Sequence, residues 1–176
     1  MRRPSRSHRR STTKLQGSPL VAASFDRSLC SCRRRLLKLF ARLAVTFYVS
    51  KRPGVEALLR AAAEAFEVVV FTAGLEEYAS LVLDRLDPAG DVIAHRLYRD
   101  ACRDAGDGML VKDLAATGRA LDQAVIVDNN PNAYSLQPEN AVPVAPFVDD
   151  VNDQELQRVM GCARWPGAPQ CVLETP

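Results

Sequence analysis

The chain has 176 residues with 47% hydrophobic and 25% charged residues, a composition that fits one globular domain and leaves no room for a second compact one. It has no apolar run of the roughly 18–20 residues that a membrane span needs. Its five cysteines have no framework spacing, which argues against a disulfide scaffold or a zinc site. Charge is unevenly divided: residues 1–46 hold ten Arg and two Lys against one acid, whereas residues 47–176 hold 11 basic and 20 acidic residues. This division predicts a basic tail on an acidic domain.

Residues 1–46 form the predicted tail. Residues 1–32 are rich in Ser and Arg and lack periodicity, which predicts disorder and weak binding of polyanions, without specific recognition of nucleic acid. An organellar transit peptide has the same composition. A first exon that does not belong to this protein could also give such a sequence. Residues 33–44 have a basic amphipathic pattern, which predicts a short helix on a membrane surface, on a partner or over a domain edge.

Residues 47–160 alternate apolar runs with helical spacing. Helices are expected at residues 55–66 and 75–86, with a weaker one at 115–121 and a last one opened by an Asn152/Glu155 capping box. Short strands are expected at 45–49, 68–71, around 92–93, at 111 and at 124–127. This order predicts an α/β domain with a parallel sheet, followed by an irregular tail at 161–176.

Polar residues follow three of these apolar segments. Thr72 ends one strand, Lys112 follows a second, and Asp128 and Asn129 end a third. In parallel α/β sheets, ligands bind at the carboxyl ends of the strands. A hydroxyl, an ammonium and oxygen ligands for Mg²⁺ together suit a phosphate site. Taken singly, the same residues also fit a strand-end hydroxyl, a solvated lysine and an Asx-rich turn.

Several motifs carry a family resemblance: Lys51-Arg52-Pro53, Val70-Phe71-Thr72-Ala73-Gly74, Tyr78-Ala79, Arg96-Leu97-Tyr98-Arg99, Val111-Lys112-Asp113-Leu114, Ile126-Val127-Asp128-Asn129-Asn130-Pro131 and Asn140-Ala141-Val142-Pro143-Val144. In this order the chain resembles the small C-terminal-domain phosphatase group, also called NLI-interacting-factor-like or FCP-homology, of the haloacid dehalogenase (HAD) superfamily. The resemblance runs from about residue 47 to 160. It implies a HAD-like, Rossmann-type sheet in a three-layer domain.

The resemblance also implies roles for individual residues. The family dephosphorylates phosphoserine or phosphothreonine proteins with Mg²⁺, through an aspartyl-phosphate. Thr72 would bind the phosphoryl group, Lys112 would neutralise its charge, and Asp128 and Asn129 would hold Mg²⁺. Two further residues match family positions that contact substrate: Tyr78 and Arg99.

One family motif was not found in the sequence. The family opens with a buried strand that ends in Asp-x-Asp-x-Thr, whose first Asp is the nucleophile. Residues 25–29 give only a faint echo, and Asp26 is not expected to be a nucleophile. We therefore expect the first central strand to be missing or replaced, with residues 45–49 filling its place or the domain destabilised. Impaired catalysis and a weakened Mg²⁺ site would follow.

Two alternatives remain open at this stage. A relative of the family is a non-catalytic receptor subunit of the inner-membrane mitochondrial protein translocase, and the Arg/Ser-rich N-terminus favours that function. The chain could also be a fragment with no stable fold. The resemblance to phosphatases points to the nucleus, and the N-terminal composition points to the mitochondrion.

Overall fold

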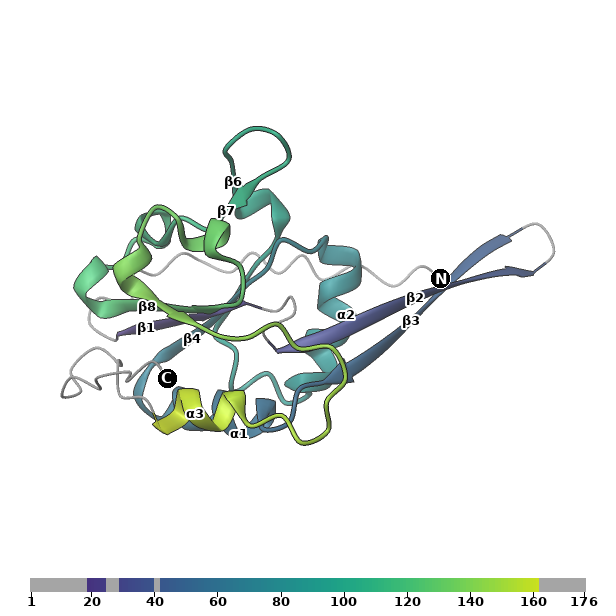
Figure 1. Cartoon of the computed structure of the whole chain (residues 1–176), viewed down its shortest axis with the longest axis horizontal. Helices are drawn as coiled ribbons and strands as arrows, with labels where there is room; N and C mark the ends of the chain where they lie inside the picture. The colour runs from purple at the N-terminus through teal and green to yellow at the C-terminus, as the bar shows by residue number, and fades with distance from the viewer. Residues whose placement is uncertain (1–18, 25–28, 40–41, 162–176) are drawn as a thin grey trace, which may run out of the picture.

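A five-stranded parallel sheet forms the centre of the computed structural model, which describes residues 19–24, 29–39 and 42–161. The spatial order is β5-β4-β1-β8-β9. Figure 1 shows the three middle strands, β4, β1 and β8, at the centre of the domain. The bounds are Leu20–Ala23 for β1, Glu67–Phe71 for β4, His95–Leu97 for β5, Ala124–Asp128 for β8 and Ala141–Pro143 for β9. The predicted α/β fold with a parallel sheet is confirmed.

The middle strand of the sheet comes from the segment that the sequence assigned to the tail. Ala23 of β1 pairs with Val70 of β4 on one side and with Val127 of β8 on the other. The expectation of disorder is therefore wrong for residues 20–23, and the domain begins before residue 47. The central strand is not missing, and residues 45–49 do not fill its place. A run of four residues that includes two alanines has low strand propensity by itself, and pairing on both edges stabilises it.

The chain then forms a long antiparallel hairpin. Strand β2 (Cys30–Leu39) pairs with β3 (Arg42–Lys51) from Cys30↔Lys51 to Leu39↔Arg42. The hairpin projects from the body of the domain (Figure 1). The helix predicted at 33–44 is wrong, whereas the strand at 45–49 is confirmed as part of β3. Spacing alone cannot separate a short helix from a strand whose stability comes from its partner.

Helices cover one face of the sheet and 3-10 turns cover the other. Helices α1 (Val55–Ala65), α2 (Glu76–Leu86) and α3 (Glu155–Gly161) share a core cluster with Val21, Val68 and Val125. The alternate strand residues, among them Leu20, Val69 and Ile126, pack with Leu114 and Tyr134 on the opposite face. Successive side chains of a strand point to opposite faces, so both faces of each central strand are buried.

The opposite face and its edge consist of short elements. The 3-10 turns are η1 (Arg99–Ala101), η2 (Leu114–Thr117), η3 (Leu121–Gln123), η4 (Pro131–Tyr134) and η5 (Pro138–Asn140). The pair β6 (Arg103–Asp104) and β7 (Leu110–Val111) forms a small antiparallel ribbon. Within the described residues, no helix has the length and apolar character needed to span a membrane.

Two local predictions differ from the structure. The strand expected around Val92 and Ile93 lies at His95–Leu97 instead, because the Asp87 carboxylate accepts hydrogen bonds from the backbone N–H groups of residues 90–93. Burial by itself would raise the pKa of Asp87, but these four N–H groups hold it below its ordinary value. Near α3, the N–H of Glu155 donates to Asp153 Oδ1 rather than to Asn152.

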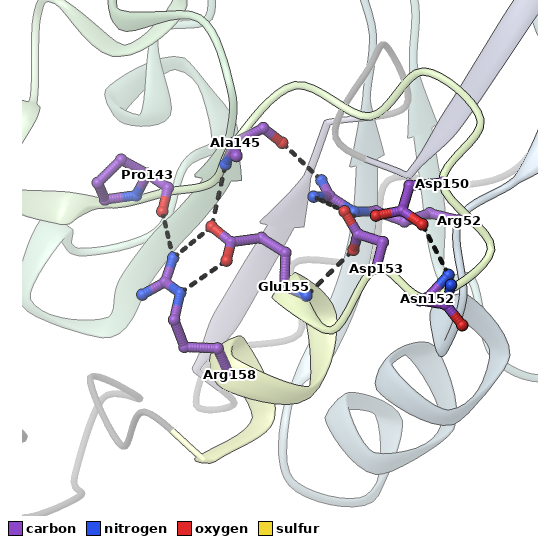
Figure 2. A network of polar contacts seen from close by, with 8 residues as sticks. All are labelled: Arg52, Pro143, Ala145, Asp150, Asn152, Asp153, Glu155 and Arg158. Carbon is purple, nitrogen blue, oxygen red and sulfur yellow. Dashed lines mark hydrogen bonds and ion pairs between the residues drawn. The ribbon is translucent and has the colours of Figure 1, made fainter.

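A buried arginine ties the start of α1 to the segment before α3 (Figure 2). Arg52 Nε and Nη2 donate to the two carboxylate oxygens of Asp153 at 2.8 and 2.7 Å, and Nη1 donates to the Ala145 carbonyl at 2.7 Å. The guanidinium also lies 5.6 Å from the centre of the Phe147 ring. Its side chain is fully buried. The hydrogen bonds with Arg52 lower the pKa of Asp153.

Candidate functional site: a phosphate site at the carboxyl edge of the sheet

The candidate site lies where the three central strands end. Ser24 follows β1, Thr72 follows β4, and Asp128 is the last residue of β8. The register places Ser24 beside Asp128, because Ala23 pairs with Val127, and the Ser24 N–H donates to the Val127 carbonyl at 2.9 Å. All three residues have 0% of their surface exposed. The position agrees with the general rule for ligand sites in parallel α/β sheets.

Lys112 brings the ammonium to this edge. Its backbone N–H donates to the Ala133 carbonyl at 2.7 Å, which fixes the segment after β7 against η4. Its Nζ donates to Ser24 Oγ at 2.6 Å and to Asp128 Oδ2 at 2.7 Å. Lys112 is 1% exposed. Charges interact more strongly in such a buried place than in water, so this cation is well suited to hold a phosphoryl group.

Thr72 begins a tight turn. Its hydroxyl accepts from the Gly74 N–H at 2.9 Å, and its own N–H donates to the Leu97 carbonyl at 2.8 Å. A Cβ at Gly74 would lie 3.1 Å from Thr72 Oγ1, so glycine allows the backbone to approach the hydroxyl. Arg99 secures the same turn, because its Nε donates to the Ala73 carbonyl at 2.8 Å.

Asp128 and Asn129 open the loop after β8. Asp128 Oδ1 accepts a hydrogen bond from the Asn130 N–H at 2.8 Å. Since Oδ2 accepts from Lys112, each of the two carboxylate oxygens accepts a hydrogen bond. Asn129 is half-buried. Burial raises the pKa of the Tyr134 phenol, and the negative charge of Asp128 adds to the rise. The phenol is therefore neutral at physiological pH.

The structure brings together three of the predicted site residues: Thr72, Lys112 and Asp128 lie at one edge. Asn129 follows Asp128 in the sequence. Arg99 is exposed beside the Thr72 turn, where it can meet a ligand. Tyr78 is half-buried and packs against the core that the helices share, as expected of a packing residue. The functional roles of these six residues stay predictions.

The sequence analysis missed Ser24. The available signal was a short apolar run, Leu20–Ala23, that follows Pro19 and leads into Ser24-x-Asp26-x-Ser28. This spacing matches Asp-x-Asp-x-Thr, with Ser24 in place of the first Asp and Ser28 in place of the Thr. Asp26 therefore falls at the second aspartate of the pattern and Ser24 at the first. Asp26 lies outside the described residues.

The site only partly suits a magnesium ion. Carboxylate, amide and hydroxyl oxygens are the right kind of ligand. The carboxylate that lies within this cluster is that of Asp128, and both of its oxygens already accept hydrogen bonds. In the described parts of the chain, no three His, Cys, Asp or Glu residues gather closely enough to hold a metal. The described residues by themselves therefore do not form a ready cation site.

Comparison with known proteins agrees with the family resemblance that the sequence motifs showed. The chain is 52% identical over 109 residues to the "Probable C-terminal domain small phosphatase" of Dictyostelium discoideum, a match that covers 62% of this chain and 35% of that protein. It is 50% identical over 109 residues to the mouse "Carboxy-terminal domain RNA polymerase II polypeptide A small phosphatase 2", covering 62% of this chain and 40% of that protein. The chain thus spans well under half the length of these relatives.

Among solved structures, fission yeast Fcp1, described as an RNA polymerase II CTD phosphatase and bound to beryllium fluoride, superposes with a TM-score of 0.58 at 17% identity. The superposition covers 82% of this chain and 50% of that one. A second Fcp1 structure gives the same TM-score at 20% identity. At this identity the likeness concerns the fold, which is that of the HAD-like phosphatases. The family model described as "NLI interacting factor-like phosphatase" matches residues 20–166, so the chain belongs to that family.

Proposed function

We propose that this chain binds phosphoserine or phosphothreonine segments of proteins at the Thr72–Lys112–Asp128 edge and hydrolyses them poorly. The observation that carries the proposal is the buried Lys112 ammonium, held between Ser24 and Asp128 at the carboxyl ends of the central strands. An ammonium and a threonine hydroxyl at this edge suit a phosphoryl group. The side chain next to them in the central strand is a hydroxyl rather than a carboxylate.

Impaired catalysis follows from the chemistry of position 24. A serine hydroxyl attacks phosphorus only when an adjacent base removes its proton. Lys112 donates a hydrogen bond to Ser24 Oγ and pairs with Asp128, so in the described part of the site the hydroxyl faces a cation rather than a base. An aspartyl-phosphate at position 24 is excluded by residue type. Mg²⁺ binding is expected to be weak for the reasons given above.

Substrate and location are also proposals. The printed names of the mouse relative and of Fcp1 refer to the C-terminal domain of RNA polymerase II, a phosphorylated protein segment. We propose a substrate of this class and a nuclear location. Phosphatase names among the relatives favour this function over a mitochondrial import receptor. Arg99, exposed beside the Thr72 turn, is the residue we assign to contacts with the flanking peptide.

A binding assay and an activity assay test this function together. Fluorescence polarisation should show that the full chain binds a phosphoseryl peptide more tightly than the unphosphorylated peptide. Thr72→Ala should reduce this difference in affinity by about tenfold, because that is the change in affinity expected when one hydrogen bond to a charged group is lost. Hydrolysis of para-nitrophenyl phosphate with Mg²⁺ should not exceed that of Thr72→Ala. Equal binding of both peptides would contradict recognition of phosphate. Robust turnover that Ser24→Ala or Asp26→Asn abolishes would contradict impaired catalysis.

A further inference from the structure

Ser24 stands at the centre of the site without having been assigned any role. It ends the middle strand, so it has Asp128 of β8 on one side and the end of β4, with Thr72 after it, on the other. Its surface is completely buried, and its hydroxyl accepts a 2.6 Å hydrogen bond from Lys112. A side chain at this place is held by two neighbouring strands and by a cation, so its position is well defined.

Among the described residues, the charges next to Ser24 balance without a metal. Lys112 contributes one positive charge and Asp128 one negative charge, and the 2.7 Å contact between them is buried at both ends. Ser24 contributes none. Asp128 Oδ2 accepts from the Lys112 ammonium and Oδ1 accepts from the Asn130 N–H, so a divalent cation at Asp128 would share this carboxylate with the ammonium and be repelled by its positive charge. One carboxylate that is already paired is a weak site for Mg²⁺, which gives up its waters reluctantly.

We infer that Ser24 is the residue that keeps this site without a metal ion and without a nucleophile, because its neutral hydroxyl leaves Lys112 as the internal counter-ion of Asp128. A carboxylate at position 24 would share the ammonium with Asp128 and leave one negative charge in excess. This excess charge is what a divalent cation requires. The inference about cation binding stands on the contacts of Ser24, Lys112 and Asp128, and its consequence for phosphoryl transfer rests on the proposed function.

The consequence for phosphoryl transfer can be written as a balanced step. A carboxylate oxygen introduced at position 24 would form a bond to phosphorus while the bond from phosphorus to the substrate serine or threonine oxygen breaks. The departing oxygen takes a proton from water. The hydroxide left behind then adds to phosphorus, the bond to the carboxylate breaks, and inorganic phosphate leaves with the carboxylate regenerated. Ser24 itself is not set up to follow this route, because its hydroxyl accepts a hydrogen bond from the Lys112 ammonium, which cannot remove its proton.

The test compares Ser24→Asp with Ser24→Asn, which has nearly the same shape but no charge. Isothermal titration of each full-length variant with MgCl₂ measures affinity without any phosphate present. We expect Ser24→Asp to bind Mg²⁺ about tenfold or more tightly than Ser24→Asn and the native chain, the change expected from one further charged contact. A folded Ser24→Asp chain with the Mg²⁺ affinity of Ser24→Asn would overturn the inference.

Activity gives an independent readout on the same pair. Ser24→Asp should hydrolyse para-nitrophenyl phosphate with Mg²⁺ above the level of Ser24→Asn, and adding Thr72→Ala should remove the gain. Tighter Mg²⁺ binding without hydrolysis would overturn the inference about the nucleophile. If the native chain binds the phosphoseryl peptide while Ser24→Asp gains nothing, the inference fails and the proposed function stands. If Ser24→Asp gains Mg²⁺ affinity but neither chain binds the phosphopeptide, the proposed function fails and the inference about cation binding stands.

A second variant keeps the inference testable if Ser24→Asp does not fold. Lys112→Met removes the internal counter-ion and leaves Asp128 charged and buried. We expect MgCl₂ to raise the melting temperature of Lys112→Met and to leave that of the native chain nearly unchanged, whereas NaCl at equal ionic strength should not. No response of Lys112→Met to Mg²⁺ would overturn the role given to Lys112.

Discussion

Two buried ion pairs in this domain look alike and serve different ends. Arg52 and Asp153 pair on the helical side, and Lys112 and Asp128 pair at the carboxyl edge of the sheet. The arginine makes a forked contact with a carboxylate, donates to a carbonyl and lies over an aromatic ring in the segment that it holds in place. The lysine contacts a serine hydroxyl and a carboxylate at two strand ends, groups that a ligand could also use.

The difference separates a structural ion pair from the pair to which we assign a role in phosphate binding. Arginine has a planar fork that suits one fixed carboxylate, whereas lysine is a compact point charge that can change partners. Arg52 joins two segments far apart in the chain, the start of α1 and the loop before α3. Lys112 joins the ends of β1 and β8, where chemistry is expected in this class of sheet. Burial alone would not have distinguished them.

The largest effect is expected from Lys112→Met. Asp128, with 0% exposure, would lose its cation and remain charged in the interior, which costs about 3–5 kcal/mol. Urea denaturation measures the loss. The double variant Lys112→Met/Asp128→Asn should recover much of it, because the uncompensated charge is gone. A double variant as unstable as Lys112→Met would show that Lys112 stabilises the fold by packing alone, and the contrast with Arg52 would disappear.

A somewhat smaller effect is expected from Arg52→Met. The change removes a forked ion pair, but the side chain of Asp153 retains 16% exposure and can hydrate, so we expect a loss of about 2–4 kcal/mol. Phosphopeptide binding by the folded fraction should be unchanged. Thermal unfolding measures the loss of stability, and fluorescence polarisation measures the phosphopeptide affinity.

Arg158→Met is the matched control for Arg52→Met. Arg158 pairs with Glu155 and donates to the Pro143 carbonyl (Figure 2), but its side chain is 37% exposed. Exposed pairs contribute about 0–1 kcal/mol, so its loss should be small. Equal losses at positions 52 and 158 would contradict the structural role assigned to the buried pair.

The sequence predicted the elements whose pattern is long or repeated. Helices α1 and α2 and strands β4 and β8 were expected within a residue or two, because a helical apolar stripe and a fully buried strand each leave a clear signal. Helix α2 begins at Glu76, one residue after the expected start, and Leu75 before it is 58% exposed. Strand β1 and the hairpin were missed, since their stability comes from partners distant in sequence.

The site was predicted only where the residue type carried the signal. Thr72, Lys112 and Asp128 follow apolar segments, so their convergence could be expected from the parallel sheet. Ser24 could not be found by searching for an aspartate, because the substitution removes the charge that the search requires. Pairing of β1 with β4 and β8 identifies the serine as the residue that follows the central strand, which the short apolar run before it only indicated.

The smallest expected effect is a loss of stability in acid that belongs to the Arg52 pair. The hydrogen bonds with Arg52 hold the pKa of Asp153 below its ordinary value of 3.8. A carboxyl with a lowered pKa in the folded state contributes stability that is fully present above its unfolded pKa and is lost as the pH falls through the folded one. The free energy of unfolding of the native chain should therefore fall between about pH 5 and pH 3 by more than that of Asp153→Asn, which is measured by urea denaturation at each pH. Asp87 and Glu56 also have lowered pKa values, but their partners are backbone N–H groups and Lys51, so they contribute alike to both chains. The difference therefore reports the Arg52 pair, with a smaller part from Glu155, whose pKa is lowered mainly by Arg158 and also by the charge of Arg52. Parallel pH profiles would show that Arg52 stabilises the fold through the Ala145 carbonyl and the Phe147 ring rather than through its charge.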